Sequence, residues 1–114
     1  MDAHANAAYS LVATAPSPAA SGATLVVTAG EGARFPAAPF NVTIWATGAQ
    51  PVWVAGGATG GNFEIARCTS RTVDTLTLTR AQEGTSARTI VVGDQIAATI
   101  TAKTLTDVEA LNAP

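Results

Sequence analysis

Residues 71–94 read RTVDTLTLTRAQEGTSARTIVVGD, and this stretch decides the fold. Threonine alternates with leucine in its first half. A period of two is typical of a half-buried β-strand, here with Leu76 and Leu78 pointing inward. A Val-Asp pair before this run and a Gly-Asp pair at the end of the stretch mark turns. The pattern therefore predicts short strands joined by close turns.

The charged insert RAQEGTSAR, residues 80–88, follows the alternating run. It is a candidate for a catalytic loop, a ligand clamp or a rigid corner of a β structure. Gly84 permits a left-handed backbone, and the hydroxyl residues after it can bind nearby amides. Glu83 is close enough in sequence to Arg80 and Arg88 to form a charge-assisted pair across the turn. We therefore interpret the insert as a rigid corner.

The same alternation recurs in other parts of the chain. In NFEIARCTS, Phe63 and Ile65 fall on one face and Glu64 and Ala66 on the other, and the residues that follow mark a bulge or the end of the strand. Further alternating segments are residues 23–28, 40–46 and 95–101. The sequence predicts an all-β fold, a small antiparallel barrel or sandwich of five to seven strands.

The two ends of the chain differ from this pattern. Residues 1–22 are rich in Ala, Ser and Pro, and we expect an extended N-terminal arm that becomes ordered only against a neighbouring molecule. Residues 23–103 form the predicted β domain. Residues 104–114 begin with a capping-box-like pattern and predict a short C-terminal helix that must pack on the barrel or on copies of itself.

Composition limits the classes of partner. The 114 residues include eight acidic and six basic side chains, a net charge of -2, so no strong field attracts nucleic acid or a membrane surface. Only 12% of the residues are charged, which favours self-association. One cysteine excludes an internal disulfide, and no apolar run approaches the roughly 20 residues of a membrane span.

No combination of residues predicts a reaction, a metal site or a cofactor. His4 is the single histidine and lies in the arm, where partners for a catalytic or metal-binding role are lacking. Cys68 lacks an evident general base, and strand cysteines are usually small buried hydrophobes. Tyr9, Trp45 and Trp53 are candidates for a sugar-stacking platform, although dispersed aromatics more often pack in the protein.

Four segments together resemble a small β domain that recurs in virion proteins of tailed bacteriophages. They are FPAAPFNVTIW, FEIARCTS, DTLTLTRAQEGTSAR and VGDQIAATITA, followed by the predicted helix, and they cover residues 23–111. In that family a Glu-hydrophobic-x-Arg/Lys-Val/Cys-Thr strand precedes an R-x-x-E-G-T turn, a Gly-Asp turn and a strand that ends in Thr. The insert VWVAGGATGG departs from the shortest family members.

The resemblance implies a non-enzymatic virion building block without cofactors. Appendage proteins usually continue into a shaft and tip, and this sequence ends at Pro114, so we expect a capsid decoration or head/neck adaptor subunit. A tail-appendage subunit and a glycan-binding module on the particle surface are the alternatives. The implied partners are copies of the chain, as a trimer, and the major capsid or other virion proteins. The implied location is the virion, assembled in the bacterial cytoplasm.

Two sets of residues follow from these arguments. The residues expected to hold the turns and the corner are Glu64, Arg80, Glu83, Gly84, Thr85, Arg88, Gly93 and Asp94. The candidate assembly contacts are Tyr9, Leu11, Trp45, Trp53, Leu105, Val108 and Leu111.

Overall fold

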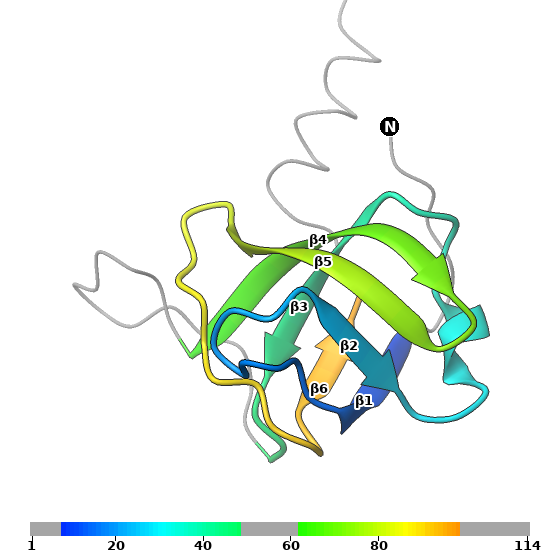
Figure 1. Ribbon diagram of the computed structural model, residues 1–114, viewed down its shortest axis with the longest axis horizontal. Coiled ribbons are helices and arrows are strands. Elements are labelled where there is room, and N and C mark those ends of the chain that lie inside the picture. The colour runs from blue at the N-terminus through cyan, green and yellow to red at the C-terminus, as the bar shows by residue number, and fades with distance from the viewer. Residues whose placement is uncertain (1–7, 49–61, 99–114) are drawn as a thin grey trace, which may run out of the picture.

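The protein is a closed six-stranded antiparallel β-barrel in a computed structural model that describes residues 8–48 and 62–98 (Figure 1). Around the barrel the strands follow the order β1-β2-β5-β4-β3-β6, and β6 pairs with β1. The predicted all-β fold is confirmed, as a barrel rather than a sandwich. The elements are β1 (Tyr9–Thr14), β2 (Thr24–Val27), the 3-10 helix η1 (Glu31–Arg34), β3 (Phe40–Trp45), β4 (Phe63–Thr72), β5 (Thr75–Gln82) and β6 (Gln95–Ala97).

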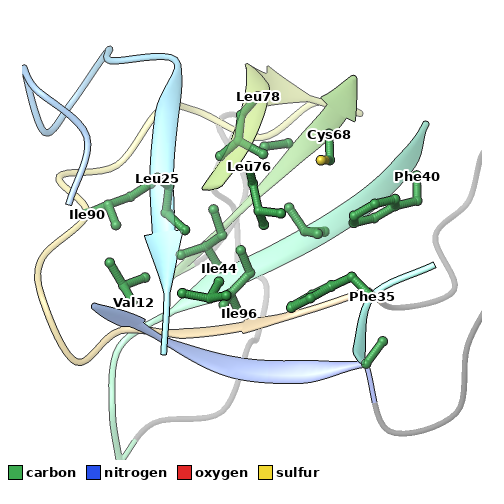
Figure 2. Packing of buried hydrophobic residues seen from close by; sticks show 14 residues of the cluster. Val12, Leu25, Phe35, Phe40, Ile44, Cys68, Leu76, Leu78, Ile90 and Ile96 are labelled. Carbon is green, nitrogen blue, oxygen red and sulfur yellow. The ribbon is translucent and has the colours of Figure 1, made fainter. Parts of the chain in front are cut away.

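Alternate residues of the strands fill the barrel interior. On β3, Ile44 lies opposite Glu64 of β4 and Ile96 of β6, so one residue from each of three strands meets at this level. The buried hydrophobic residues of the interior form one core cluster. Burial of each large aliphatic or aromatic side chain contributes about 1.5–3 kcal/mol, which makes this cluster the main source of stability. The labelled members of the cluster are Val12, Leu25, Phe35, Phe40, Ile44, Cys68, Leu76, Leu78, Ile90 and Ile96 (Figure 2).

Strand β1 corrects the prediction that residues 1–22 are an arm outside the β domain. Residues 9–14 pair with β2 on one side and β6 on the other, and Val12 is 1% exposed in the core. The arm prediction is wrong for this segment because one of its two pairing partners, β6, lies far along the chain and leaves no local signal. Residues 1–7 lie outside the described residues.

The link from β1 to β2 is also part of the barrel rather than of a free arm. Pro16 and Gly22 are buried, and the amide of Ile90 donates to the carbonyl oxygen of Ala19 at 3.2 Å. Proline and alanine suited the idea of an extended arm, but their low polarity equally suits a segment packed against the barrel.

Strand β4 presents buried residues on both faces. Glu64, Ala66 and Cys68 lie opposite the inward residues of β3, so they point into the barrel. Phe63 and Ile65 therefore point outward, yet they are only 9% and 8% exposed. The register of β4 against β5 shifts before and after Cys68, which confirms a bulge near this residue, and the strand continues to Thr72.

The predicted C-terminal helix over residues 104–114 lies outside the described residues, as do Trp53 and His4. Leu105, Val108 and Leu111 also lie outside the described residues. Among the residues that the structure does describe, no helix has the length and hydropathy of a membrane span.

Candidate functional site

Glu64 and Arg80 form a buried ion pair where β4 begins and β5 ends. Arg80 Nε donates to Glu64 Oε2 at 2.8 Å, and Arg80 Nη2 donates to Glu64 Oε1 at 2.9 Å. The Arg80 side chain is 8% exposed and the Glu64 side chain is 0% exposed. This is the bidentate arrangement that gives an arginine-carboxylate pair its strength and its fixed geometry.

Backbone groups complete the hydrogen bonding of both side chains. The amides of Ala81 and Arg88 donate to the Glu64 carboxylate at 2.8 and 3.0 Å. The Arg80 guanidinium donates in turn to three carbonyl oxygens, those of Gly22 at 3.0 Å, Ala19 at 3.3 Å and Arg88 at 2.7 Å. The pair thus joins β4, β5, the β1-β2 link and Arg88, the last residue of the 80–88 insert.

The corner, residues 80–88, contains several left-handed backbone positions. The φ angles are 55° at Ala81, 53° at Glu83 and 81° at Gly84. Two successive positive φ values at Glu83 and Gly84 turn the chain sharply, and glycine adopts such a value without steric cost. The predicted left-handed conformation of Gly84 is confirmed.

Thr85 attaches the corner to β4. Its hydroxyl donates to the carbonyl oxygen of Gln82 at 2.7 Å and accepts from the amide of Ile65 at 3.0 Å. Thr85 is 7% exposed. The hydroxyl therefore takes a position beside β4 that a backbone carbonyl would occupy in a continuous sheet, in addition to the local bond that the sequence predicted.

The predicted pairing of Glu83 with Arg80 and Arg88 is wrong. Arg80 pairs with Glu64, and Arg88 Nη1 pairs with Asp94 Oδ2 at 2.7 Å. Glu83 instead accepts a hydrogen bond from Asn41 Nδ2 on β3 at 2.8 Å. Arg80 continues the inward alternation of Leu76 and Leu78 and so points toward the inward carboxylate of β4, whereas Glu83 lies beyond the register shift of β5.

Asp94 fixes the second predicted turn. Its Oδ2 atom accepts from the Val91 amide at 3.0 Å as well as from Arg88, and its own amide donates to the Val91 carbonyl at 3.1 Å. Gly93 has a φ of 95°, which only glycine adopts readily. The predicted Gly-Asp turn is confirmed. Its buried carboxylate is tied to the corner through the ion pair with Arg88.

One structural carboxylate was missed by sequence reasoning. Asp74, in the β4-β5 hairpin turn, accepts from the amides of Gly30 at 3.0 Å and Gly32 at 2.9 Å. These hydrogen bonds lower the pKa of Asp74. A Cβ on Gly32 would collide with the backbone of Val73, so the loop before η1 lies tightly on the hairpin. The hairpin turn was predicted, but its contact with Gly32 spans 42 residues and leaves no local signal.

The geometry of these carboxylates suits holding the fold rather than catalysis. Each oxygen of Glu64 accepts two hydrogen bonds and the side chain is 0% exposed, so its proton-accepting positions are occupied. Burial raises the pKa of the Cys68 thiol to about 11, which keeps the sulfur protonated at neutral pH. Within residues 8–48 and 62–98, no group of three or more His, Cys, Asp and Glu side chains is placed to hold a metal ion.

Three candidate assembly contacts come together on the outside of the barrel. Tyr9 and Leu11 of β1 are 40% and 39% exposed, and the ring of half-buried Trp45 on β3 lies 6.5 Å from that of Tyr9. Strand β6 runs between them, and Gln95 is opposite both Leu11 and Trp45. We call this the β1-β6-β3 face. Its outward-pointing residues are Tyr9, Leu11, Thr43, Trp45, Gln95 and Ala97, of which Thr43 is only 6% exposed.

Hydrogen bonds hold the polar groups of this face in place. The Tyr9 hydroxyl donates to Gln95 Oε1 at 3.1 Å, and Gln95 Nε2 donates to the carbonyl oxygen of Ala46 at 2.9 Å. The six residues of the face include no charged side chain. At its edge, Arg34 donates to the Tyr9 carbonyl and pairs with Glu31. Gln95 lies on the middle strand, so the face has a polar side chain between Leu11 on β1 and Trp45 on β3.

Comparisons with known proteins leave the function to be argued from this geometry. No protein-family model matches the chain, and no curated protein matches it either.

Proposed function

We propose that the chain is a non-enzymatic structural protein of a tailed-bacteriophage virion, a capsid decoration or head/neck adaptor subunit. The supporting observation is that Glu64, the central carboxylate of the motif, lies 0% exposed and accepts four hydrogen bonds from within the chain. The motif thus serves to lock a small barrel. A closed barrel has no unpaired strand edge that could pair with another chain, so it contacts its neighbours through side chains. Such a surface suits repeated packing on a particle.

The other residues of the motif support the same proposal. Thr85 and Asp94 are buried and bonded to the backbone, while Gly84 and Gly93 take the left-handed conformations that the turns need. The β1-β6-β3 face gathers three of the residues expected to mediate assembly. Copies of this chain, arranged as a trimer, and the major capsid or another virion protein are the proposed partners.

Antibody labelling of virions tests the proposal. Particles of the phage that encodes this chain are purified, incubated with antibody against the chain and imaged by negative stain, with particles lacking the gene as the control. We expect label on the capsid or neck. Label at the tail tip favours the tail-appendage alternative. Particles without label would contradict a virion role.

A glycan-binding module is a second candidate because Tyr9 and Trp45 lie 6.5 Å apart on one face. Two adjacent ring faces suit the stacking of a sugar. Titration of host-surface oligosaccharides, followed by tryptophan fluorescence and ligand-detected NMR, tests this function. Binding that Trp45→Ala abolishes and Val73→Ala retains would support it, since Val73 is exposed on the β4-β5 turn.

A further inference from the structure

Strand β1 is held in the barrel by short ladders on both sides. Against β2 its register shifts between Val12 and Thr14, and with β6 it pairs over the short segment 9–11. Strands β3 and β4, by contrast, stay in register along the whole of β3. One connection, the link 15–23, joins β1 to the other described strands. Removal of β1 therefore leaves the other five strands paired side by side, in the order β2-β5-β4-β3-β6.

Strand β1 contributes little of the hydrophobic core. Its inward side chains are Ser10 and Val12, which are 0% and 1% exposed. Larger members of the core cluster, such as Phe40, Leu76 and Ile96, belong to the other elements. Local opening involves the segments of a protein that have few buried apolar contacts. The five remaining strands keep most of the core when β1 leaves.

The gap that β1 fills matches both the backbone and the inward side chains of β1. The Val12 amide donates to the Asp94 carbonyl at 2.8 Å, and the Val12 carbonyl accepts from the Gly93 amide at 2.9 Å. Inside the barrel, the Ser10 hydroxyl donates to Glu31 Oε1 at 2.7 Å. An open gap has two strand edges with unpaired backbone groups, which are a template for another strand. The β1 strand of a second copy fits this gap as well as the chain's own β1, because the two strands are identical.

The link contains a segment where the path of the chain can change. Arg80 anchors the link at residues 19–22 through hydrogen bonds to two carbonyl oxygens. In residues 15–18 the side chains of Ser17 and Pro18 are exposed, and the two prolines of this segment favour extended backbone at the residues before them. Four extended residues span up to about 14 Å, which exceeds the separation of about 10 Å between packed sheets. This segment is therefore long enough to carry β1 to an adjoining copy.

We propose that copies of this chain exchange β1, so that the strand of one subunit closes the barrel of the next. The exchanged barrel has the same contacts as the closed one, so the link and the protein concentration determine the balance between the two forms. A short tether gives β1 an effective concentration of about millimolar at its own barrel. The net charge of -2 opposes the approach of a second copy only weakly. This inference concerns the purified chain and does not rest on a virion role, which particle labelling tests separately.

A pair of cysteines across β1 and β6 distinguishes the two forms. Leu11 and Gln95 lie opposite each other on these strands. The next residues, Val12 and Asp94, are hydrogen-bonded, so Leu11 and Gln95 are a non-hydrogen-bonded pair, whose closely spaced Cα atoms suit a cross-strand disulfide. Leu11→Cys with Gln95→Cys forms this disulfide within one chain in the closed barrel and between two chains after exchange. Native Cys68 is buried and is alkylated only after unfolding.

Isotope labelling separates the two kinds of disulfide. An equal mixture of unlabelled and nitrogen-15-labelled double variant is refolded from urea under reducing conditions, at about 1 mM to match the effective concentration of the tether. The protein is then oxidised, alkylated and digested, and the linked peptides are weighed by mass spectrometry. A peptide pair with one labelled and one unlabelled half comes from two chains.

Thr24→Cys with Thr77→Cys is the matched control. These residues lie opposite each other on the outside of β2 and β5, and the Leu78 amide beside them donates to the Ala23 carbonyl, so they too are a non-hydrogen-bonded pair. Both follow the link in sequence, so exchange of β1 leaves them in one chain. We expect mixed-label disulfides for the Leu11 pair to fall about 100-fold when refolding is carried out at about 10 µM instead of about 1 mM, and to be absent from the control at both concentrations.

A longer link provides a second measurement in the same cysteine background. Insertion of Gly-Ser-Gly after exposed Ser17 lets β1 fold back into its own barrel with less constraint. The fraction of disulfides between chains should therefore fall several-fold. Disulfides only within chains at about 1 mM, equal between-chain fractions for the two cysteine pairs, or a between-chain fraction that neither dilution nor the insertion changes would each overturn the proposal.

Discussion

Replacement of Glu64 by glutamine tests whether the buried ion pair holds the barrel closed. The carboxylate accepts two bonds from Arg80 and one each from the amides of Ala81 and Arg88. An amide has one acceptor oxygen, so its NH₂ group must face at least one of these donors. Removal of one partner from a buried pair typically costs about 3–5 kcal/mol. A domain of this size has a total stability of about 5–15 kcal/mol.

We expect Glu64→Gln to lower the free energy of unfolding by about 3 kcal/mol or more, which corresponds to a fall in Tm of at least about 10 °C. Urea and thermal unfolding followed by tryptophan fluorescence measure both quantities. Glu83→Gln is the matched control, because Glu83 is only partly buried at the turn and its change should cost about 0–1 kcal/mol.

The double variant Glu64→Leu with Arg80→Met separates this network from a simple ion pair. Replacement of both members of a buried pair by apolar residues is often neutral. Here it would leave two amides and three carbonyls without their partners, at about 1–3 kcal/mol for each group that stays buried and unpaired. We therefore expect no recovery of stability. Full recovery, or equal small effects of Glu64→Gln and Glu83→Gln, would refute the reasoning.

Three further predictions concern single residues. Gly84→Val should lower stability by about 1 kcal/mol or more, because a β-branched residue fits poorly at a φ of 81°, whereas Gly84→Asn should cost less; chemical unfolding compares the two. Asp74 has a lowered pKa, so its ionised form stabilises the fold above the ordinary value of 3.8, and this contribution is lost as the pH falls through the lowered pKa. The stability difference between the wild type and Asp74→Asn, measured by urea unfolding at several pH values, should therefore narrow on acidification; a constant difference would contradict the assignment. The Cys68 thiol, with its pKa raised to about 11, should react with a disulfide reagent at neutral pH only on unfolding, and fast reaction in the native protein would show that it is accessible.

The sequence by itself determined the local elements of this protein. The alternation of Thr and Leu identified β5, and the Val-Asp and Gly-Asp pairs were correctly assigned to turns. These signals are local because a strand has a period of two and a left-handed turn favours glycine. Gly84 and the hydroxyl residues after it likewise identified the corner.

The tertiary structure alone decided which elements close the barrel and which charges pair. Residues 9–14 became a strand only because β2 and β6 flank them, and β6 lies more than 80 residues away in sequence. Arg80 pairs with Glu64 rather than with the nearer Glu83 because alternation along β5 and β4 directs Arg80 and Glu64 into the barrel and the pairing of the two strands brings them together. Charge and proximity along a chain do not encode that register. Long-range pairing sets it, since a one-residue shift moves a side chain to the opposite face.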